Sequence, residues 1–189
     1  MGDETYLRSV TLGEPESGAS VVLVDYDATW PSVFGFERAK ILTALGDVAQ
    51  GVEHVGSTSV PGLCAKPIID ILLAVESAAD EALYVPALEH AGYRLRVREP
   101  DWYEHRMLKG DDPAVNLHVF SSGCEEAARM LRFRDWLRAH DEERDLYARE
   151  KRRLAAMPWR FVQEYADAKS DVVAQIMMRA EGDGPSVLG

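Results

Sequence analysis

The chain has 189 residues, 47% of them apolar, and its 32 acidic and 21 basic residues give a formal net charge of -11. This length and composition predict one domain with a hydrophobic core. The acidic balance argues against general nucleic-acid or membrane binding, because both need a basic surface. No apolar run approaches the roughly 20 residues of a transmembrane helix, and no signal peptide is evident. We therefore expect a cytoplasmic protein without membrane contact.

Residues 1–20 are polar and contain several glycines, so we predict a flexible leader there. A short strand is expected at 21–24. A helix should then begin near Pro31, which suits a first helical turn, and end at Gly46. The aromatic residues before this helix would stack on a base or pack the helix start, and packing is favoured because aromatic side chains dominate core energetics.

The stretch 52–75, VEHVGSTSVPGLCAKPIIDILLAV, predicts two strands joined by a turn and a constrained loop. Asp70 is the one carboxylate within the apolar second strand, and a buried Asp needs a compensating partner. The turn at 56–59 offers hydroxyl and backbone N–H groups that suit a phosphate. A phosphate-binding turn followed by a strand Asp indicates a nucleotide site.

The later part of the chain changes from strands to helices. Predicted strands lie at 93–97, 103–109 and 115–120, the last two forming a hairpin. Predicted helices lie at 77–91, 125–139, 141–156 and 159–180. With a frayed tail at 181–189, this order predicts one α+β domain over 21–180, in which a mixed β-sheet is backed by helices and followed by a C-terminal helical third.

Two histidines are candidate partners of Asp70. Strand alternation places His118 on the face opposite Leu117 and Val119. Its imidazole would bind a metal, donate to a phosphate or act as a base, or would only be satisfied by hydrogen bonds at a sheet margin. His54, just before the turn, has the same alternatives. A site of Asp70 and both histidines would suit Mn²⁺ or Zn²⁺ better than Mg²⁺.

Four basic residues are candidates for charge stabilisation. Lys66 and Arg106 would face a triphosphate, or would be solvated surface charges. Lys151 and Lys169 each follow a tyrosine at i,i+4 spacing, so each pair shares one helix face. These pairs would grip a phosphorylated substrate, or the lysine stems would only cover buried tyrosines.

The string HVGSTSVPGLCAKPIIDI resembles the signature of the GrpB-like family, which is classed with the polymerase-β-type nucleotidyltransferases. The resemblance covers about residues 21–180 and implies a sheet of the nucleotidyltransferase type. In that superfamily a Gly-Ser turn precedes a strand with Asp-x-Asp, and a third acid comes from a later strand. In this chain Leu72 replaces the second acid, and His118 stands on the strand where the third is expected.

The resemblance implies nucleotide binding and metal-assisted nucleotidyl transfer from a nucleoside triphosphate to a small acceptor. Asp70, His118 and Arg106 would be catalytic, and Asp70, His54 and His118 would bind a divalent metal, Mg²⁺ or Mn²⁺. The expected phosphate-binding residues are Gly56, Ser57, Thr58, Ser59, Lys66, Lys151 and Lys169. The alternative is a non-catalytic ligand-binding or accessory domain, like the GrpB-like segment fused to dephospho-CoA kinase. Leu72 favours this alternative, whereas the basic residues favour an enzyme.

Overall fold

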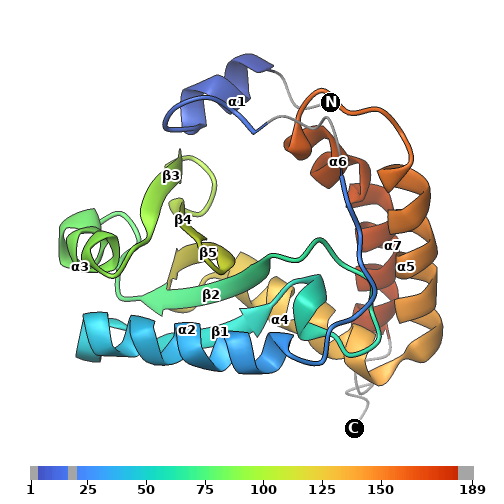
Figure 1. The fold of residues 1–189 in the computed structure, drawn as a ribbon, viewed down its shortest axis with the longest axis horizontal. Coiled ribbons are helices and arrows are strands. Elements are labelled where there is room, and N and C mark those ends of the chain that lie inside the picture. Colours follow the sequence, from blue (N-terminus) through green and yellow to red (C-terminus); the bar gives the residue numbers. More distant parts are fainter. Residues whose placement is uncertain (1–3, 17–20, 183–189) are drawn as a thin grey trace, which may run out of the picture.

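The computed structural model describes residues 4–16 and 21–182, which form a five-stranded mixed sheet surrounded by helices (Figure 1). The strands are β1 (Gly51–Val55), β2 (Ile69–Val75), β3 (Arg94–Glu99), β4 (His105–Asp111) and β5 (Ala114–Ser121). The helices are α1 (Glu4–Val10), α2 (Trp30–Leu45), α3 (Val85–His90), α4 (Glu125–Ala139), α5 (Asp141–Ala155), α6 (Val162–Ala168) and α7 (Ser170–Gly182). The predicted α+β class, with its helical third, is confirmed.

The strand order β1-β2-β5-β4-β3 places β2 and β5 at the centre of the sheet. These two strands run parallel, and the other neighbours run antiparallel. The central position of β2 explains its near-continuous apolar sequence, because a central strand covered on both faces excludes water. Asp70 pairs in register with Asn116 of β5.

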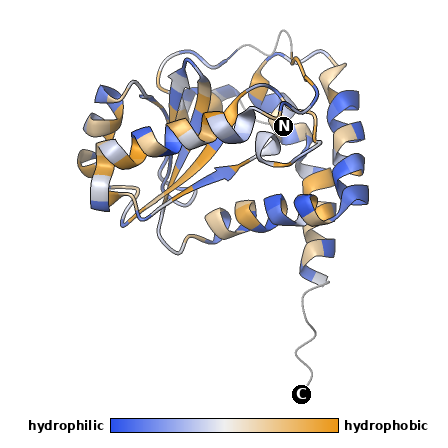
Figure 2. Ribbon diagram, turned by 60° about the horizontal axis from the view of Figure 1, so that its bottom comes forward, coloured by the Kyte–Doolittle hydropathy of each residue, from blue (hydrophilic) through white to orange (hydrophobic). Residues whose placement is uncertain are grey.

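The two faces of the sheet are covered differently. Helices α2 and α3 pack on the face that carries Ile71, Leu73 and Leu117, where the largest buried cluster lies. On the other face, α4 covers only Val55, Leu72 and their neighbours. Helices α5, α6 and α7 stand beside one end of the sheet (Figure 1). Figure 2 shows hydrophobic residues concentrated in the central strands and mixed residues along the helices.

Several element boundaries differ from the prediction. The strand expected at 21–24 is a single bridge between Val24 and Ala65. The segment at 77–91 contains a short 3₁₀ helix and then α3, with Pro86 in the first turn of α3. The predicted helix at 159–180 is two helices, α6 and α7, which meet at Lys169.

Residues 4–16 do not form the flexible leader that the sequence predicts. Helix α1 buries Leu7, and Thr11 forms a bridge with Val97 of β3, so this segment is held by apolar contact and by pairing with the sheet edge. Residues 17–20 and most of the predicted tail, residues 183–189, lie outside the described residues. Within the described part of the chain, no helix has the length and apolar character needed to cross a membrane.

Candidate functional site

A cavity of about 600 Å³ lies between the Asp70 face of the sheet and the C-terminal helices, with residues of the N-terminal segment on its rim. Its charged lining is strongly basic although the chain as a whole is acidic. Among the described residues, the basic lining residues are Lys66, Arg94, Arg96, Lys109, Lys151 and Lys169, and the acidic ones are Glu16, Asp70 and Asp111. Such a surplus of positive charge favours an anionic ligand.

The predicted phosphate turn forms one wall of this cavity. Gly56 has φ +68°, and a 3₁₀ helix follows at Ser57–Ser59. The Asp70 side chain packs directly on Gly56, because a Cβ added at Gly56 would lie 2.4 Å from Asp70 Oδ2. Both the backbone angle and this close approach require glycine. The turn and the strand carboxylate are therefore fitted to each other.

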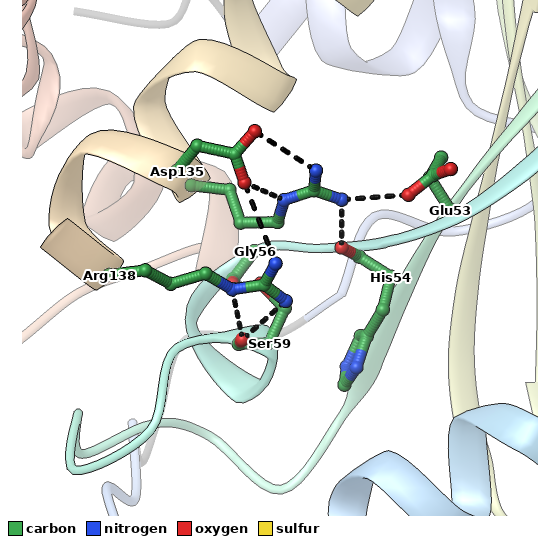
Figure 3. Close-up of polar contacts among 7 residues, drawn as sticks. Glu53, His54, Gly56, Ser59, Asp135 and Arg138 are labelled. Carbon is green, nitrogen blue, oxygen red and sulfur yellow. Dashed lines mark hydrogen bonds and ion pairs between the residues drawn. The ribbon is translucent and has the colours of Figure 1, made fainter.

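Two arginines of α4 hold the back of the turn (Figure 3). Arg138 donates to the Ser59 carbonyl from Nε and Nη2 at 3.0 and 2.9 Å. Arg134 donates to the His54 carbonyl at 3.0 Å and to Glu53 at 2.9 Å. Asp135 accepts from both guanidinium groups. These bonds fix both ends of the turn to α4, a role that the sequence analysis did not identify.

Asp70 lies in the cavity wall with 27% of its side chain exposed. Asn116 Nδ2 donates to Asp70 Oδ1 at 2.9 Å, and His118 Nε2 is 3.8 Å from the same oxygen. Burial opposes ionisation of Asp70, but the neighbouring His118, Asn116 and Lys66 outweigh it, so the pKa of Asp70 lies below its ordinary value. Asp70 is therefore ionised at neutral pH.

Lys151 of α5 is almost completely buried, with 2% exposure. Its Nζ donates to Ser57 Oγ at 2.7 Å and to the Cys64 carbonyl, and it lies 5.1 Å from the centre of the Tyr147 ring. Burial lowers the pKa of Lys151 to about 7. Lys151 thus joins α5 to the turn, and an anionic ligand would stabilise its charged form.

Lys66 and Lys169 reach the same cavity from the loop before β2 and from the end of α6. Burial lowers the pKa of Lys169 to about 8, with a further contribution from Lys66, and burial also lowers the pKa of Lys66. Tyr165 is buried with Lys169 Nζ 4.6 Å from its ring centre. The tyrosines are buried, as the structural interpretation of the Tyr–Lys pairs predicts, and both lysines line the cavity; that they hold a phosphorylated substrate stays a prediction.

Two predicted site residues lie on the opposite face of the sheet. Arg106 pairs in register with Val119, and its Nε donates to Glu81 at 2.5 Å beside α3. Its predicted role in charge stabilisation at this site is wrong, because strand alternation turns it away from His118. Arg106 forms a structural ion pair instead.

His54 is the second such residue. It pairs with Ile71 and therefore faces away from Asp70. Its ring stacks on Phe34 with centroids 4.8 Å apart, and Nε2 contacts the Thr58 hydroxyl at 3.0 Å. Burial lowers the pKa of His54 to about 4. The predicted metal trio does not form.

The three hydroxyl residues of the turn do not all line the cavity. Ser57 and Thr58 line the cavity, although the Thr58 hydroxyl is bonded to His54. The Ser59 hydroxyl donates to the Gly56 carbonyl at 2.6 Å, and Ser59 lines a separate pocket near α2. Ser59 therefore shapes the turn without contacting the cavity.

The residues present do not form a metal site by themselves. No group of three or more His, Cys, Asp or Glu in the described chain is placed to hold a metal ion. Leu72, at the second acid position, is 4% exposed and packs under α4. Asp70 and His118 supply two ligands, so a divalent cation would need the phosphate oxygens of a ligand to complete its coordination.

Several cavity residues had no role in the sequence analysis. Asn116 is one, and only the register of β5 against β2 brings it to Asp70. Arg94 and Arg96 are two residues apart on β3, and Lys109 is on the neighbouring β4. In a regular strand the i,i+2 spacing of Arg94 and Arg96 predicts a shared face, but here the pairing of β3 shifts between Leu95 and Val97, so alternation does not place Arg96.

Fold and cavity together define a mixed-sheet α+β protein with a basic cavity at one end of the sheet. A family model described as GrpB protein matches residues 20–179 of the chain. The chain belongs to the GrpB family, as the resemblance implies.

Three comparisons illustrate the range of relatives. A UPF0157 protein of Halalkalibacterium halodurans is 61% identical over 175 residues, which are 92% of this chain and 90% of that protein. The crystal structure of the conserved protein GrpB from Enterococcus faecalis matches with a TM-score of 0.71 at 29% identity, covering 84% of this chain and 96% of that one. A dephospho-CoA kinase of Mycolicibacterium paratuberculosis is 35% identical over 160 residues, 71% of this chain but 39% of the kinase.

Proposed function

We propose that the protein binds a phosphorylated small molecule, and that this ligand is a nucleoside triphosphate. The observation that carries the proposal is the buried Lys151, whose ammonium group is bonded to Ser57 of the glycine turn at 2.7 Å. Lys66 and Lys169 lie in the same cavity. An anionic group bound against the turn would offset the cost of holding these lysines together away from water.

The size of the cavity supports a ligand of nucleotide size. Small-molecule sites usually enclose about 300–1,000 Å³, and this one measures about 600 Å³. Its lining also contains apolar groups, including Leu23, Ile68 and Phe161, against which a base would pack. Mg²⁺ or Mn²⁺ would enter with the nucleotide, held by the triphosphate and Asp70, because Mg²⁺ commonly binds through one or two carboxylates and substrate phosphates.

Nucleotidyl transfer to a small acceptor is the second candidate function. The pair of Asp70 and His118 in the cavity favours it, because a carboxylate and an imidazole near a phosphate are suited to acid–base chemistry. The buried Leu72 weighs against it, since the second carboxylate of Asp-x-Asp is missing. Binding without transfer is therefore the function that the geometry supports best, and a GrpB-like domain in a larger protein would then act as a ligand-binding accessory.

Thermal unfolding with each of the four nucleoside triphosphates, with and without Mg²⁺ or Mn²⁺, tests the proposal. A ligand at a hundredfold excess over its Kd stabilises the folded state by about 2.7 kcal/mol. For a chain of this size that corresponds to a rise in Tm of roughly 5–10 °C. Lys169→Met should reduce the shift strongly. Arg153→Met is the matched control, because Arg153 is an exposed cation on the outside of α5.

Asp70→Asn tests whether Asp70 holds the metal, a role on which nucleotidyl transfer depends and which the binding proposal also includes. If Asp70 holds a metal–nucleotide complex for transfer, Asn should abolish the extra stabilisation by the metal while leaving metal-free nucleotide binding intact. Equal metal effects in both proteins would contradict a role in transfer. No Tm shift with any of the four nucleotides would contradict nucleotide binding itself.

A further inference from the structure

A chain of side-chain contacts runs from helix α1 to the wall of the cavity. Tyr6 Oη donates to Glu99 Oε1 at 2.8 Å, and Glu99 Oε2 is 2.7 Å from His105 Nδ1. His105 Nε2 is in turn 3.1 Å from His118 Nδ1. His118 Nε2 then faces Asp70 Oδ1 at 3.8 Å. Four adjacent strands and the N-terminal helix contribute to this relay.

Packing holds the relay in one geometry. The rings of His105 and His118 stack with centroids 5.3 Å apart and planes 20° apart. His105 also stacks on Phe120 at 4.7 Å, and Trp102 meets it edge-on at 5.3 Å. His105 is only 5% exposed. Its ring therefore has little freedom to flip or to exchange its partners for water.

The position of each proton follows from the order of these contacts. The pKa of Tyr6 is raised to about 12 by burial and by its bond to Glu99, so the tyrosine donates. Glu99 is then a carboxylate that accepts on both oxygens, and His105 Nδ1 must carry a proton. In neutral His105 the lone pair is on Nε2, so it accepts from His118 Nδ1–H. Neutral His118 is left with its lone pair on Nε2.

We infer that Tyr6, Glu99 and His105 are positioning residues that hold neutral His118 as its Nδ1–H form, with the Nε2 lone pair facing the cavity beside Asp70. An outer hydrogen-bond partner commonly selects the tautomer of a functional histidine in this way. The lone pair and the Asp70 carboxylate are then two adjacent acceptors 3.8 Å apart, and while His118 is neutral in this form Asn116 and Lys66, not His118, stabilise the ionised Asp70. They suit a hydroxyl or amino group of the ligand, whereas the lysines suit its phosphates.

The assignment to a ligand group rests on the proposed function, but the tautomer of His118 does not. It is measured on the full chain without ligand, by NMR of protein with ¹³C,¹⁵N-labelled histidine at a pH where the imidazoles are neutral. The expected spectrum shows His118 protonated at Nδ1. Finding His118 of the unmodified protein protonated at Nε2 would overturn the inference.

Two variants remove the relay at different points. His105→Phe keeps a ring stacked on Phe120 but offers no acceptor to His118 Nδ1, and Glu99→Leu frees the His105 proton to move to Nε2. Both should convert His118 to the Nε2–H form, with Nε2–H directed at Asp70. An unchanged His118 in a folded His105→Phe variant would contradict the inference.

The controls are an independent histidine and an exposed acid. His140 Nδ1 is 2.9 Å from the Trp136 carbonyl, so it should remain Nδ1–H in every variant. Glu89→Leu, at an exposed position on α3, should leave His118 unchanged. This measurement needs no nucleotide, so a failure to bind nucleotides would not change its result. Equally, finding His118 in the Nε2–H form would not contradict nucleotide binding.

Discussion

At the scale of single residues, Gly56 has the tightest structural requirement in the candidate site. Its backbone lies in the left-handed region, and its missing side chain makes room for the Asp70 carboxylate. The same residue therefore determines the shape of the turn and the position of Asp70. A substitution there acts on both at once.

Gly56→Ala should lower the free energy of unfolding by about 2–5 kcal/mol, combining backbone strain with overpacking against Asp70. Urea denaturation measures the loss. Gly123→Ala is the matched control, because Gly123 has φ +80° but an added Cβ there meets no described atom within 4 Å. The control reports the backbone cost alone, so equal losses in the two variants would show that the contact with Asp70 is unimportant.

Lys151 gives the protein a characteristic pH dependence. Its pKa is about 7 in the folded protein, against an ordinary value of 10.5. Between these values the unfolded chain binds more protons than the folded one, so the free energy of unfolding should rise with pH from about 7 to 10.5. On lowering the pH this stability is lost progressively from 10.5 to about 7, and below 7 no more is lost because the folded protein is also protonated.

Lys151→Met should reduce this rise to the part that Lys169 and Lys66 contribute, and urea midpoints at pH 6.5, 8 and 9.5 measure it. The slope is the readout, because the variant also loses the bonds to Ser57 and to the Cys64 carbonyl. Arg153→Met should keep the slope of the unmodified protein, since an exposed guanidinium does not titrate in this range. An unchanged slope in Lys151→Met would mean that the buried lysine keeps its ordinary pKa.

At the scale of elements, α4 has two separate tasks. Its apolar side covers Leu72 and Val55, and Arg134 and Arg138 reach from the same helix to the ends of the turn. The helix thus determines where the turn lies relative to the sheet. Helix α1 acts at the opposite rim, where Leu7 lines the cavity and Tyr6 begins the relay.

Arg138→Lys should weaken the attachment of the turn, because lysine lacks the fork that places two donors on the Ser59 carbonyl. We expect a loss of about 1 kcal/mol in the free energy of unfolding, since Arg138 is partly exposed, and a weaker nucleotide-dependent Tm shift. Arg132→Lys on an exposed position of α4 is the control. Unaltered stability and ligand response in Arg138→Lys would show that the two bonds from Arg138 to the Ser59 carbonyl have no influence on the turn.

At the scale of the whole molecule, charge is distributed unevenly. The chain carries a formal net charge of -11, yet the described part of the cavity has six basic side chains and three acidic ones. The cavity is assembled from the N-terminal segment, the central turn, four strands and the C-terminal helices. Such a local field attracts a small anion while the acidic exterior opposes a long polyanion.

The sequence by itself determined the class of fold, the family and the centre of the candidate site. A lone Asp in an apolar strand, a Gly-Ser turn before it and an amphipathic C-terminal third are local patterns, and each corresponds to a local structure. The turn and Asp70 are separated by a short loop, so their proximity follows from two adjacent paired strands.

Only the tertiary structure decided which distant side chains face Asp70. Sheet register turned Arg106 and His54 to the far face and brought Asn116 and His118 to the near one. A shift of one residue reverses the face of every side chain on a strand, and no local pattern specifies the register between strands far apart in sequence. The bonds from Arg138 to the turn and the contact between Tyr6 and Glu99 likewise join segments about 80–90 residues apart. Their contacts exist because the whole chain packs, and composition or periodicity carries no signal for them.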